Sequence, residues 1–178
     1  MAKRTKQTEF QGKGLQKPED SFGGSLLKGN PKTKRPLESK LPIHLTIRAA
    51  RSTLRTPKTY SAVNLLVERT AKKYGVRIYH YANVGNHLHV LLKISRVGRW
   101  PAFIRELTGR IAQIVGEILG LKGKFWRFRP HTRIVRGWQK AFRSARLYVQ
   151  LNWLEAEGFI SRRETKTLKD LRAIWADG

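Results

Sequence analysis

The sequence contains no cysteine and few acidic residues. Without cysteine, disulfide bridges, cysteine-ligated zinc and thiol catalysis are excluded, so any metal must bind His, Asp, Glu, Asn, Gln or water. Only 12 Asp and Glu stand against 37 Lys and Arg in the 178 residues, which gives a formal net charge of +25. This excess predicts a polyanionic partner, and nucleic acid is the polyanion that fits it best.

Long apolar runs are also missing. No stretch approaches the roughly 20 apolar residues that span a bilayer, and the first ten residues, MAKRTKQTEF, lack the apolar core of a secretion signal. We therefore expect no membrane partner and a cytoplasmic protein. The hydrophobic share of 40% is nevertheless close to that of globular domains, so most of the chain is expected to fold.

Three segments are predicted along the chain. Residues 1–40 combine Lys, Gly, Ser, Thr and Pro with isolated apolar residues and show no period, which predicts a disordered basic arm. Residues 41–160 carry alternating and helical patterns and are expected to form the folded domain. Residues 161–178 are expected to form a C-terminal helical extension, with a short helix over 162–175.

The folded segment has the predicted element order strand, helix, strand, strand, helix, strand, helix. Alternation predicts strands over 43–49, 76–81 and 87–95 and an extended region over 125–136; helical periodicity predicts helices over 59–74, 100–119 and 138–157. This order predicts an α+β fold of the ferredoxin-like or RNA-recognition-like split βαβ kind. Its four-stranded antiparallel sheet would have the first and third strands at the centre, with two helices on one face and the C-terminal helices added.

Two histidines mark the third predicted strand. His87 and His89 are two residues apart, so their side chains project from the same face of the strand. Two imidazoles on one face form half of a divalent metal site, and another element and water would supply the remaining ligands. The alternative is a simple pair of surface histidines.

The third predicted helix carries a phenol and an amide on one face. Tyr148 and Asn152 are four residues apart and therefore neighbours, with the small residues Ala141 and Ala145 on the same side. A phenol can act as a nucleophile, and an amide oxygen can serve as a third ligand for a hard divalent ion. The alternatives are an ordinary amphipathic aromatic residue and an accidental polar residue inside a helix.

Cations and aromatic rings alternate before this helix. In the run FWRFRPHTRIVR, aromatic side chains are interleaved with Arg127, Arg129, Arg133 and Arg136. Lys140, Arg143 and Arg146 continue the positive charge along the helix. Stacking surfaces mixed with cations are typical of proteins that bind single-stranded nucleic acid. For any one of these residues a solvated basic face is an equally good explanation, but it explains so many in one region poorly.

These motifs together resemble a known family. The run GNHLHVLLKIS resembles the His-hydrophobic-His signature of the HUH endonucleases, and AFRSARLYVQLNWLEAEGF resembles their helix with a single catalytic tyrosine. Within that superfamily the sequence is most similar to the REP-associated tyrosine transposases, over about residues 41–159. Two positions depart from the family pattern: Trp153 stands where the family usually has Pro, and better known relatives have Gln at the position of Asn152.

The resemblance implies metal-assisted cleavage of single-stranded or hairpin DNA. Tyr148 would attack a backbone phosphate to give a covalent 5′-phosphotyrosine and a free 3′-hydroxyl, and His87, His89 and Asn152 would hold Mg or Mn. His44 and His131 are nearby candidates for structural or phosphate-contacting roles. Two other functions stay open: a non-catalytic nucleic-acid-binding module, either a domesticated transposase or an RNA-recognition-like binder, and a basic structural protein of a ribonucleoprotein. A monomer and a homodimer are equally compatible with the sequence.

Overall fold

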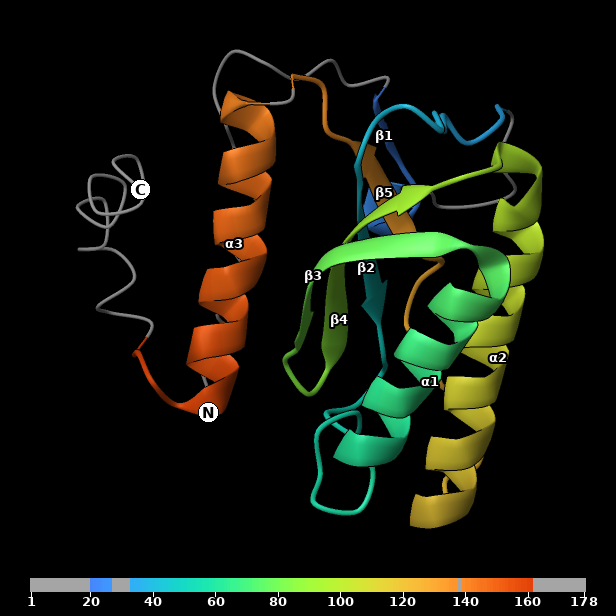
Figure 1. Ribbon diagram of the computed structural model, residues 1–178. Coiled ribbons are helices and arrows are strands. Elements are labelled where there is room, and N and C mark those ends of the chain that lie inside the picture. The colour runs from blue at the N-terminus through green and yellow to red at the C-terminus, as the bar shows by residue number, and fades with distance from the viewer. Residues whose placement is uncertain (1–19, 27–32, 138, 162–178) are drawn as a thin grey trace.

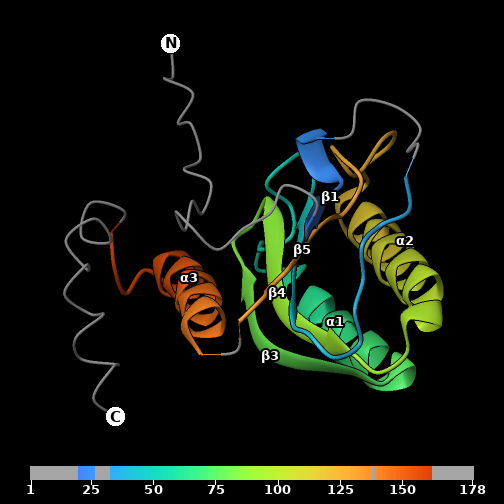
Figure 2. The same cartoon turned by 90° about the horizontal axis from the view of Figure 1, so that it is seen from above.

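A computed structural model describes residues 20–26, 33–137 and 139–161 of the chain. The elements form three layers, which Figures 1 and 2 show from two directions. A single sheet lies in the middle, with helices α1 (Tyr60–Tyr74) and α2 (Trp100–Leu119) on one face and helix α3 (Lys140–Glu157) on the other. None of these helices is long and apolar enough to cross a membrane.

The sheet has five strands in the order β1-β5-β2-β4-β3, and all neighbouring strands are antiparallel. The strands are β1 (Ser21–Phe22), β2 (Ile43–Arg48), β3 (Val76–Asn83), β4 (His87–Ile94) and β5 (His131–Ile134). The first and third predicted strands, β2 and β4, lie side by side, with β5 next to β2 and β3 next to β4. The predicted α+β class and the central position of these two strands are therefore confirmed, and β1 adds a fifth strand beyond β5.

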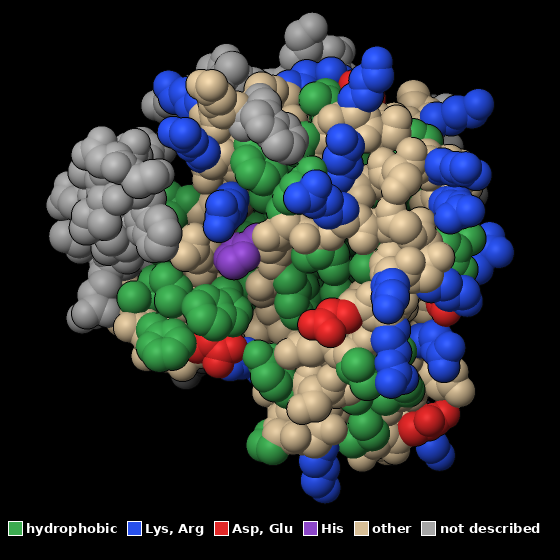
Figure 3. Space-filling model, in the orientation of Figure 1, with side chains coloured by type: hydrophobic (Ala, Val, Ile, Leu, Met, Phe, Trp, Pro, Cys, Tyr) green, Lys and Arg blue, Asp and Glu red, His purple; other side chains and the backbone are tan. Residues whose placement is uncertain are grey.

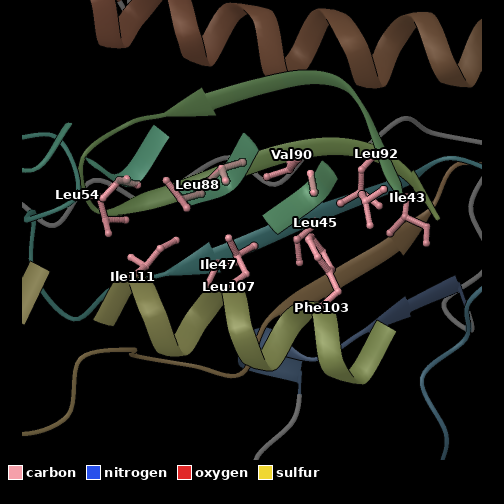
Figure 4. Packing of buried hydrophobic residues seen from close by; sticks show 14 of the residues in the cluster. Ile43, Leu45, Ile47, Leu54, Leu88, Val90, Leu92, Phe103, Leu107 and Ile111 are labelled. Atoms are coloured by element: carbon pink, nitrogen blue, oxygen red, sulfur yellow. The ribbon is translucent and has the colours of Figure 1, made fainter. Parts of the chain in front are cut away.

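The main hydrophobic core lies between the sheet and the pair α1 and α2. Leu45 lies opposite Val90 and Ile47 opposite Leu88, so alternate residues of β2 and β4 project to the same side. They pack against three residues of α2, which Figure 4 shows from close by: Phe103, Leu107 and Ile111. All seven side chains are at most 2% exposed. Burial of each stabilises the fold by about 1.5–3 kcal/mol, which holds the two central strands in a fixed register.

Helix α3 covers the opposite face of the sheet. Its buried residues Ala145 and Val149 pack against Ala82 of β3 and Leu91 of β4. Because these α3 side chains are small, the helix backbone comes close to the sheet. The helix ends at Gly158, whose φ of 80° lies in the left-handed region that glycine adopts without steric strain.

Part of the predicted N-terminal arm belongs to the fold. Residues 20–26 and 33–40 are described, and β1 pairs with β5, followed by a short 3-10 helix (Gly24–Leu26). The Arg35 guanidinium donates to the Phe22 carbonyl at 3.1 Å and to the Thr132 hydroxyl at 2.6 Å. The predicted disorder is therefore wrong for these two stretches, because backbone pairing and one guanidinium order them without any periodic pattern. Residues 1–19 and 27–32 lie outside the described residues.

The remaining elements differ from their predicted extents by a few residues at most, with one exception. The predicted extended region over 125–136 forms a ladder only in β5, preceded by an isolated bridge between Ala49 and Trp126. Pro130 directly before β5 has no N–H to donate, which limits the ladder on that side. A second 3-10 helix (Val97–Arg99) leads into α2. The helix expected over 162–175 lies outside the described residues.

Candidate active site

All five histidines of the chain lie on the sheet face that α3 covers. His44 and His80 lie opposite Leu91 on the neighbouring strands. His89 and His131 lie opposite Thr46, and His87 is two residues from His89 on β4. Residues directly opposite on antiparallel strands project to the same side, and Leu91 packs against α3. The sheet therefore presents a surface rich in imidazoles to the helix.

His87 and His89 lie next to each other on this face, as their spacing predicts. Their ring centroids are 4.5 Å apart and the rings are nearly perpendicular, at 79°. Both residues are buried, with exposed fractions of 7% and 2%. The Asn86 side-chain oxygen shares a hydrogen bond with Nδ1 of His87, which fixes the orientation of that ring.

A third imidazole, His44 of β2, contacts His89 directly. Nε2 of His44 lies 3.2 Å from Nδ1 of His89, and the two rings stack at 5.3 Å. Burial, followed by the charges of His131, Arg133 and His87, lowers the pKa of His44 to about 3. Burial also lowers the pKa of His89 well below its usual value, followed by the charge of His44. Both rings are therefore neutral at physiological pH, which is the form of imidazole that binds metals.

Tyr148 of α3 lies over these two histidines. Its ring centroid is 5.3 Å from that of His89 and 5.6 Å from that of His44, and both contacts are edge-on. Ala145, about one turn earlier on the helix, is buried and small, so it allows this close approach. The structure thus brings the predicted nucleophile and one predicted metal ligand together from elements far apart in the sequence.

Asn152 follows Tyr148 by about one helical turn. Its side-chain nitrogen donates to the Tyr148 carbonyl at 2.7 Å, which leaves the amide oxygen as the atom that could bind a metal. Helix α3 and strand β4 run in opposite directions (Figure 1). The step from Tyr148 to Asn152, about one helical turn of 5.4 Å, therefore runs in the same direction as the step from His89 to His87, about 6.7 Å along the strand, and has a similar length. This places Asn152 at the level of His87.

The histidine pair fits a divalent metal ion. Nε2 of His89 is buried and has no hydrogen-bond partner among the described residues, although the other nitrogen of the ring is bonded. A buried polar atom without a partner is costly, and a metal ion would satisfy it. The described residues contain no group of three or more His, Cys, Asp or Glu side chains that could hold an ion. The remaining ligands would therefore be amide or water oxygens, which suit Mg and Mn.

The predicted DNA-binding residues lie in three parts of the fold and at Arg136. Arg133 of β5 lies opposite His44; the others lie on the segment before β5 (Arg127, Arg129) and on α3 (Lys140, Arg143, Arg146). The Arg127 guanidinium lies 5.1 Å from the centre of the Phe128 ring, so a cation and an aromatic ring adjoin there. In the view of Figure 3, Lys and Arg side chains are widespread and acidic ones are few.

Arg136, also predicted to bind DNA, is held in two ion pairs. Its guanidinium donates to Asp20 and to Glu38, each at 2.7 Å, and these contacts raise the pKa of Arg136. The carboxylates belong to the N-terminal segments, so Arg136 links those segments to the connection between β5 and α3. A phosphate at Arg136 would have to replace these two partners.

One group of site residues has no signal in the sequence. The Glu157 carboxylate at the end of α3 accepts two hydrogen bonds from Arg55, at 3.1 and 2.7 Å, and one from the Tyr60 hydroxyl at 2.9 Å. The Arg55 guanidinium also lies 4.5 Å from the centre of the Tyr60 ring. These residues, which we call the Glu157 clamp, fix the end of the Tyr148 helix to the start of α1. Arg55 and Glu157 are 102 residues apart, so no local pattern indicates their contact.

Comparison with known proteins gives matches at the level of structure. No family model matches the chain, and no curated protein sequence does. The structure of a REP-associated tyrosine transposase bound to a REP hairpin is similar, at 18% identity and a TM-score of 0.54, over 74% of this chain and 76% of that one. A presumed transposase from Deinococcus radiodurans R1 is similar at 13% identity and a TM-score of 0.43, over 71% of this chain and 98% of that one. The family resemblance found in the sequence is confirmed at the level of architecture: this chain has the fold of a REP-associated tyrosine transposase.

Proposed function

We propose that this protein is a transposase-like enzyme, a metal-dependent tyrosine endonuclease and strand transferase that acts on single-stranded or hairpin DNA. The observation that carries the proposal is the position of the Tyr148 ring over His89 and His44, across the interface between α3 and the sheet. A phenol beside buried neutral imidazoles, on a strongly basic protein, combines a nucleophile, metal ligands and a site for a polyanion.

In this proposal Tyr148 is the nucleophile. Its phenol oxygen forms a bond to the phosphorus of a backbone phosphate, and the bond from phosphorus to the 3′ oxygen breaks. The phenol proton is released and the departing 3′ oxygen takes up a proton, which leaves a 5′-phosphotyrosine and a free 3′-hydroxyl. The phosphodiester energy is kept in the tyrosyl ester, so attack by a 3′-hydroxyl rejoins strands without an external energy source.

His87 and His89 would hold Mg or Mn, with the Asn152 amide oxygen and water as further ligands. When bound, the ion would polarise the attacked phosphate and stabilise the negative charge that develops on it. Asn86 and His44 orient the two histidine rings through their Nδ1 atoms, as residues behind a metal ligand usually do. The Glu157 clamp holds the helix that carries Tyr148.

The DNA partner is supported by charge and by the similar transposase. Six of the basic residues named above lie on β5, on the segment before it and on α3: Arg127, Arg129, Arg133, Lys140, Arg143 and Arg146. They are suited to phosphate groups, and the Phe128 ring beside Arg127 is suited to stacking on a base. Because the similar transposase was solved with a REP hairpin, a hairpin of that kind with single-stranded flanks is the first substrate to test.

The test is formation of a covalent protein-DNA adduct. The protein is incubated with a labelled, flanked hairpin and Mg or Mn, and a denaturing gel reveals any band that carries both label and protein. The double variant His87→Ala/His89→Ala should bind the hairpin but form no adduct, whereas His80→Ala, on the edge strand of the same face, should form it normally. Undiminished cleavage by the double variant would remove the ion from the mechanism. Tight binding without an adduct under any ion would instead indicate a non-catalytic binding module.

A further inference from the structure

A cavity of about 310 Å³ lies away from the histidine face. It is lined by the second half of α2, the loop after β2 and the loop after α2, including Arg51, Ala112, Gly116, Lys122, Lys124 and Phe125. Its volume is at the lower end of the range for pockets that bind small ligands, about 300–1,000 Å³. We call it the α2 cavity.

The lining of the α2 cavity favours an anion with a flat apolar part. Arg51, Lys122 and Lys124 are exposed cations, the lining contains no acidic side chain, and none of the three forms an ion pair within the described residues. Phe125 is half-buried and provides an aromatic surface beside them. Cations for phosphates combined with a ring for stacking are the features that bind a nucleotide.

The α2 cavity adjoins the end of the sheet at which the histidine pair begins. Arg48, the last residue of β2, lies opposite His87, the first residue of β4. Ala50, about 7 Å further along the chain, lines the cavity and donates its N–H to the Phe125 carbonyl at 2.8 Å. In Figure 1 the end of β2, the end of α2 and the start of β4 are the lower ends of these three elements. A strand that passes His87 can therefore reach the cavity by turning around this end.

We propose that the α2 cavity binds one unpaired nucleotide from the single-stranded flank of the DNA substrate. Its base stacks on Phe125, and the two phosphates that flank it contact Arg51, Lys122 and Lys124. A nucleotide within a chain has a phosphate on each side, and three cations that form no ion pair among the described residues are enough to neutralise these two negative charges. This proposal rests on the proposed function, since it takes DNA as the substrate.

The test measures binding of a flanked hairpin without divalent ions, so that no cleavage occurs. An abasic site is moved through the flank one nucleotide at a time. With the wild-type protein, one position should lower the affinity about tenfold, which is the size expected for loss of one stacked base. Phe125→Leu should bind the intact oligonucleotide with that lowered affinity and should be insensitive to the abasic site at that one position.

A second variant guards against an effect of Phe125 on the fold. Phe125 also packs against the main core, so its replacement could alter stability. Ala112→Met fills the cavity from α2 and leaves Phe125 in place, and it should lose sensitivity to the same abasic position. Thermal unfolding of each variant shows whether the fold is kept.

The charges are tested with a matched control. Lys122→Ala/Lys124→Ala should lower the affinity for the flanked hairpin at least tenfold more than for a hairpin without flanks. Arg69→Ala/Lys72→Ala removes the same charge from exposed positions on α1 and should lower both affinities by the same small factor. Equal effects of the two double variants would overturn the proposal.

The outcomes separate this proposal from the proposed function. If the adduct forms but no abasic position loses its effect in Phe125→Leu, the nucleotide site alone is overturned. If one abasic position does lose its effect in Phe125→Leu but no adduct forms, the nuclease is overturned and the nucleotide site is supported. A protein that binds neither hairpin would overturn both.

Discussion

The Glu157 carboxylate accepts hydrogen bonds from both terminal nitrogens of the Arg55 guanidinium, at 3.1 and 2.7 Å. Arg55 lies just before α1, and Glu157 is the last residue of α3, the helix that carries Tyr148. The helices α1 and α3 lie on opposite faces of the sheet (Figure 1). Since only Ala145 and Val149 of α3 are fully buried against the sheet, the clamp fixes the rotation of the helix at its end. We therefore expect the direction of the Tyr148 ring to depend on this contact, which lies more than two turns away along the helix.

Glu157→Gln should slow cleavage far more than it weakens DNA binding. The variant loses the charge of a bidentate pair, so α3 can rotate and Tyr148 moves relative to His89. A displacement of about 1 Å at a reacting group can cost up to about a hundredfold in rate. We expect the rate of adduct formation to fall at least tenfold, with hairpin affinity within twofold and a loss of about 1 kcal/mol in the free energy of unfolding.

Glu106→Gln is the matched control for this prediction. Glu106 also accepts bonds from a cation and a tyrosine, Lys73 at 2.7 Å and Tyr74 at 2.8 Å, but it links α1 to α2 away from the histidine face. Its replacement should leave the rate of adduct formation within twofold of the wild type. An equal slowing by both variants would show that Glu157 has no positioning role.

The Glu157 clamp should also be visible in the pH dependence of stability. Hydrogen bonds from Arg55, and then from Tyr60, hold the pKa of Glu157 below the ordinary carboxyl value of 4.5. A lowered pKa in the folded state contributes stability above the ordinary value, and this is lost as the pH falls through the lowered pKa. The difference in free energy of unfolding between wild type and Glu157→Gln should therefore be constant from about pH 6 to 8 and shrink below about pH 4.5. Urea unfolding measures it, and a constant difference down to about pH 3 would contradict the prediction.

His44 should control the affinity of the site for metal. If Nε2 of His89 carries the lone pair for the ion, the proton of that ring is on Nδ1 and is donated to Nε2 of His44, 3.2 Å away. His44→Ala removes this acceptor and leaves the Thr46 hydroxyl, 3.4 Å from Nδ1 of His89, as the remaining one. The variant should weaken Mn binding at least tenfold, measured by titration of the free Mn signal in electron paramagnetic resonance. His80→Ala removes an imidazole from the same face on the edge strand β3 and should leave the affinity unchanged. The same loss in both variants would mean that His44 has no special role.

The convergence of histidines and tyrosine was predictable because it follows from local periods. Two residues along a strand return to the same face, which puts His87 and His89 together, and helical spacing puts Tyr148 and Asn152 together. The order of elements then places β2 and β4 at the centre of the sheet. On β2 the alternation of His44, Thr46 and Arg48 likewise indicates that these three side chains share one face of the strand. It does not indicate which ring His44 contacts.

The parts that could not be predicted depend on contacts between distant segments. Strand β1 has two residues, which is too short to show any period, and the pairing with β5 defines it. The ion pairs of Arg136 carry no signal in the sequence, because its carboxylate partners Asp20 and Glu38 lie in a segment without a pattern. The Glu157 clamp and the α2 cavity likewise arise only when loops meet in three dimensions. Sequence periodicity reports which face a residue occupies, and tertiary packing decides its partner.

The other four tyrosines have structural contacts that account for them. Three donate their hydroxyl groups within the fold: Tyr60 to Glu157 at 2.9 Å, Tyr74 to Glu106 at 2.8 Å and Tyr81 to Asn64 at 2.9 Å. Burial also raises the pKa of Tyr81, which disfavours the phenolate. Tyr79 packs its ring edge-on against Phe142, with the centroids 5.1 Å apart. Tyr148 is the tyrosine whose ring contacts both His44 and His89.

Tyr148→Phe should therefore abolish both strand cleavage and the covalent adduct. The change removes one oxygen and almost no volume from a half-buried ring, so the edge-on contacts with the histidines remain and the free energy of unfolding should change by less than about 1 kcal/mol. Hairpin affinity should stay within twofold, because phosphate contacts of Lys and Arg supply most of it. Tyr79→Phe is the control and should form the adduct at the wild-type rate. Peptide mass mapping of the wild-type adduct should place the nucleotide on Tyr148. An adduct on another tyrosine, or cleavage without any adduct, would show that the phenol of Tyr148 is not the attacking group.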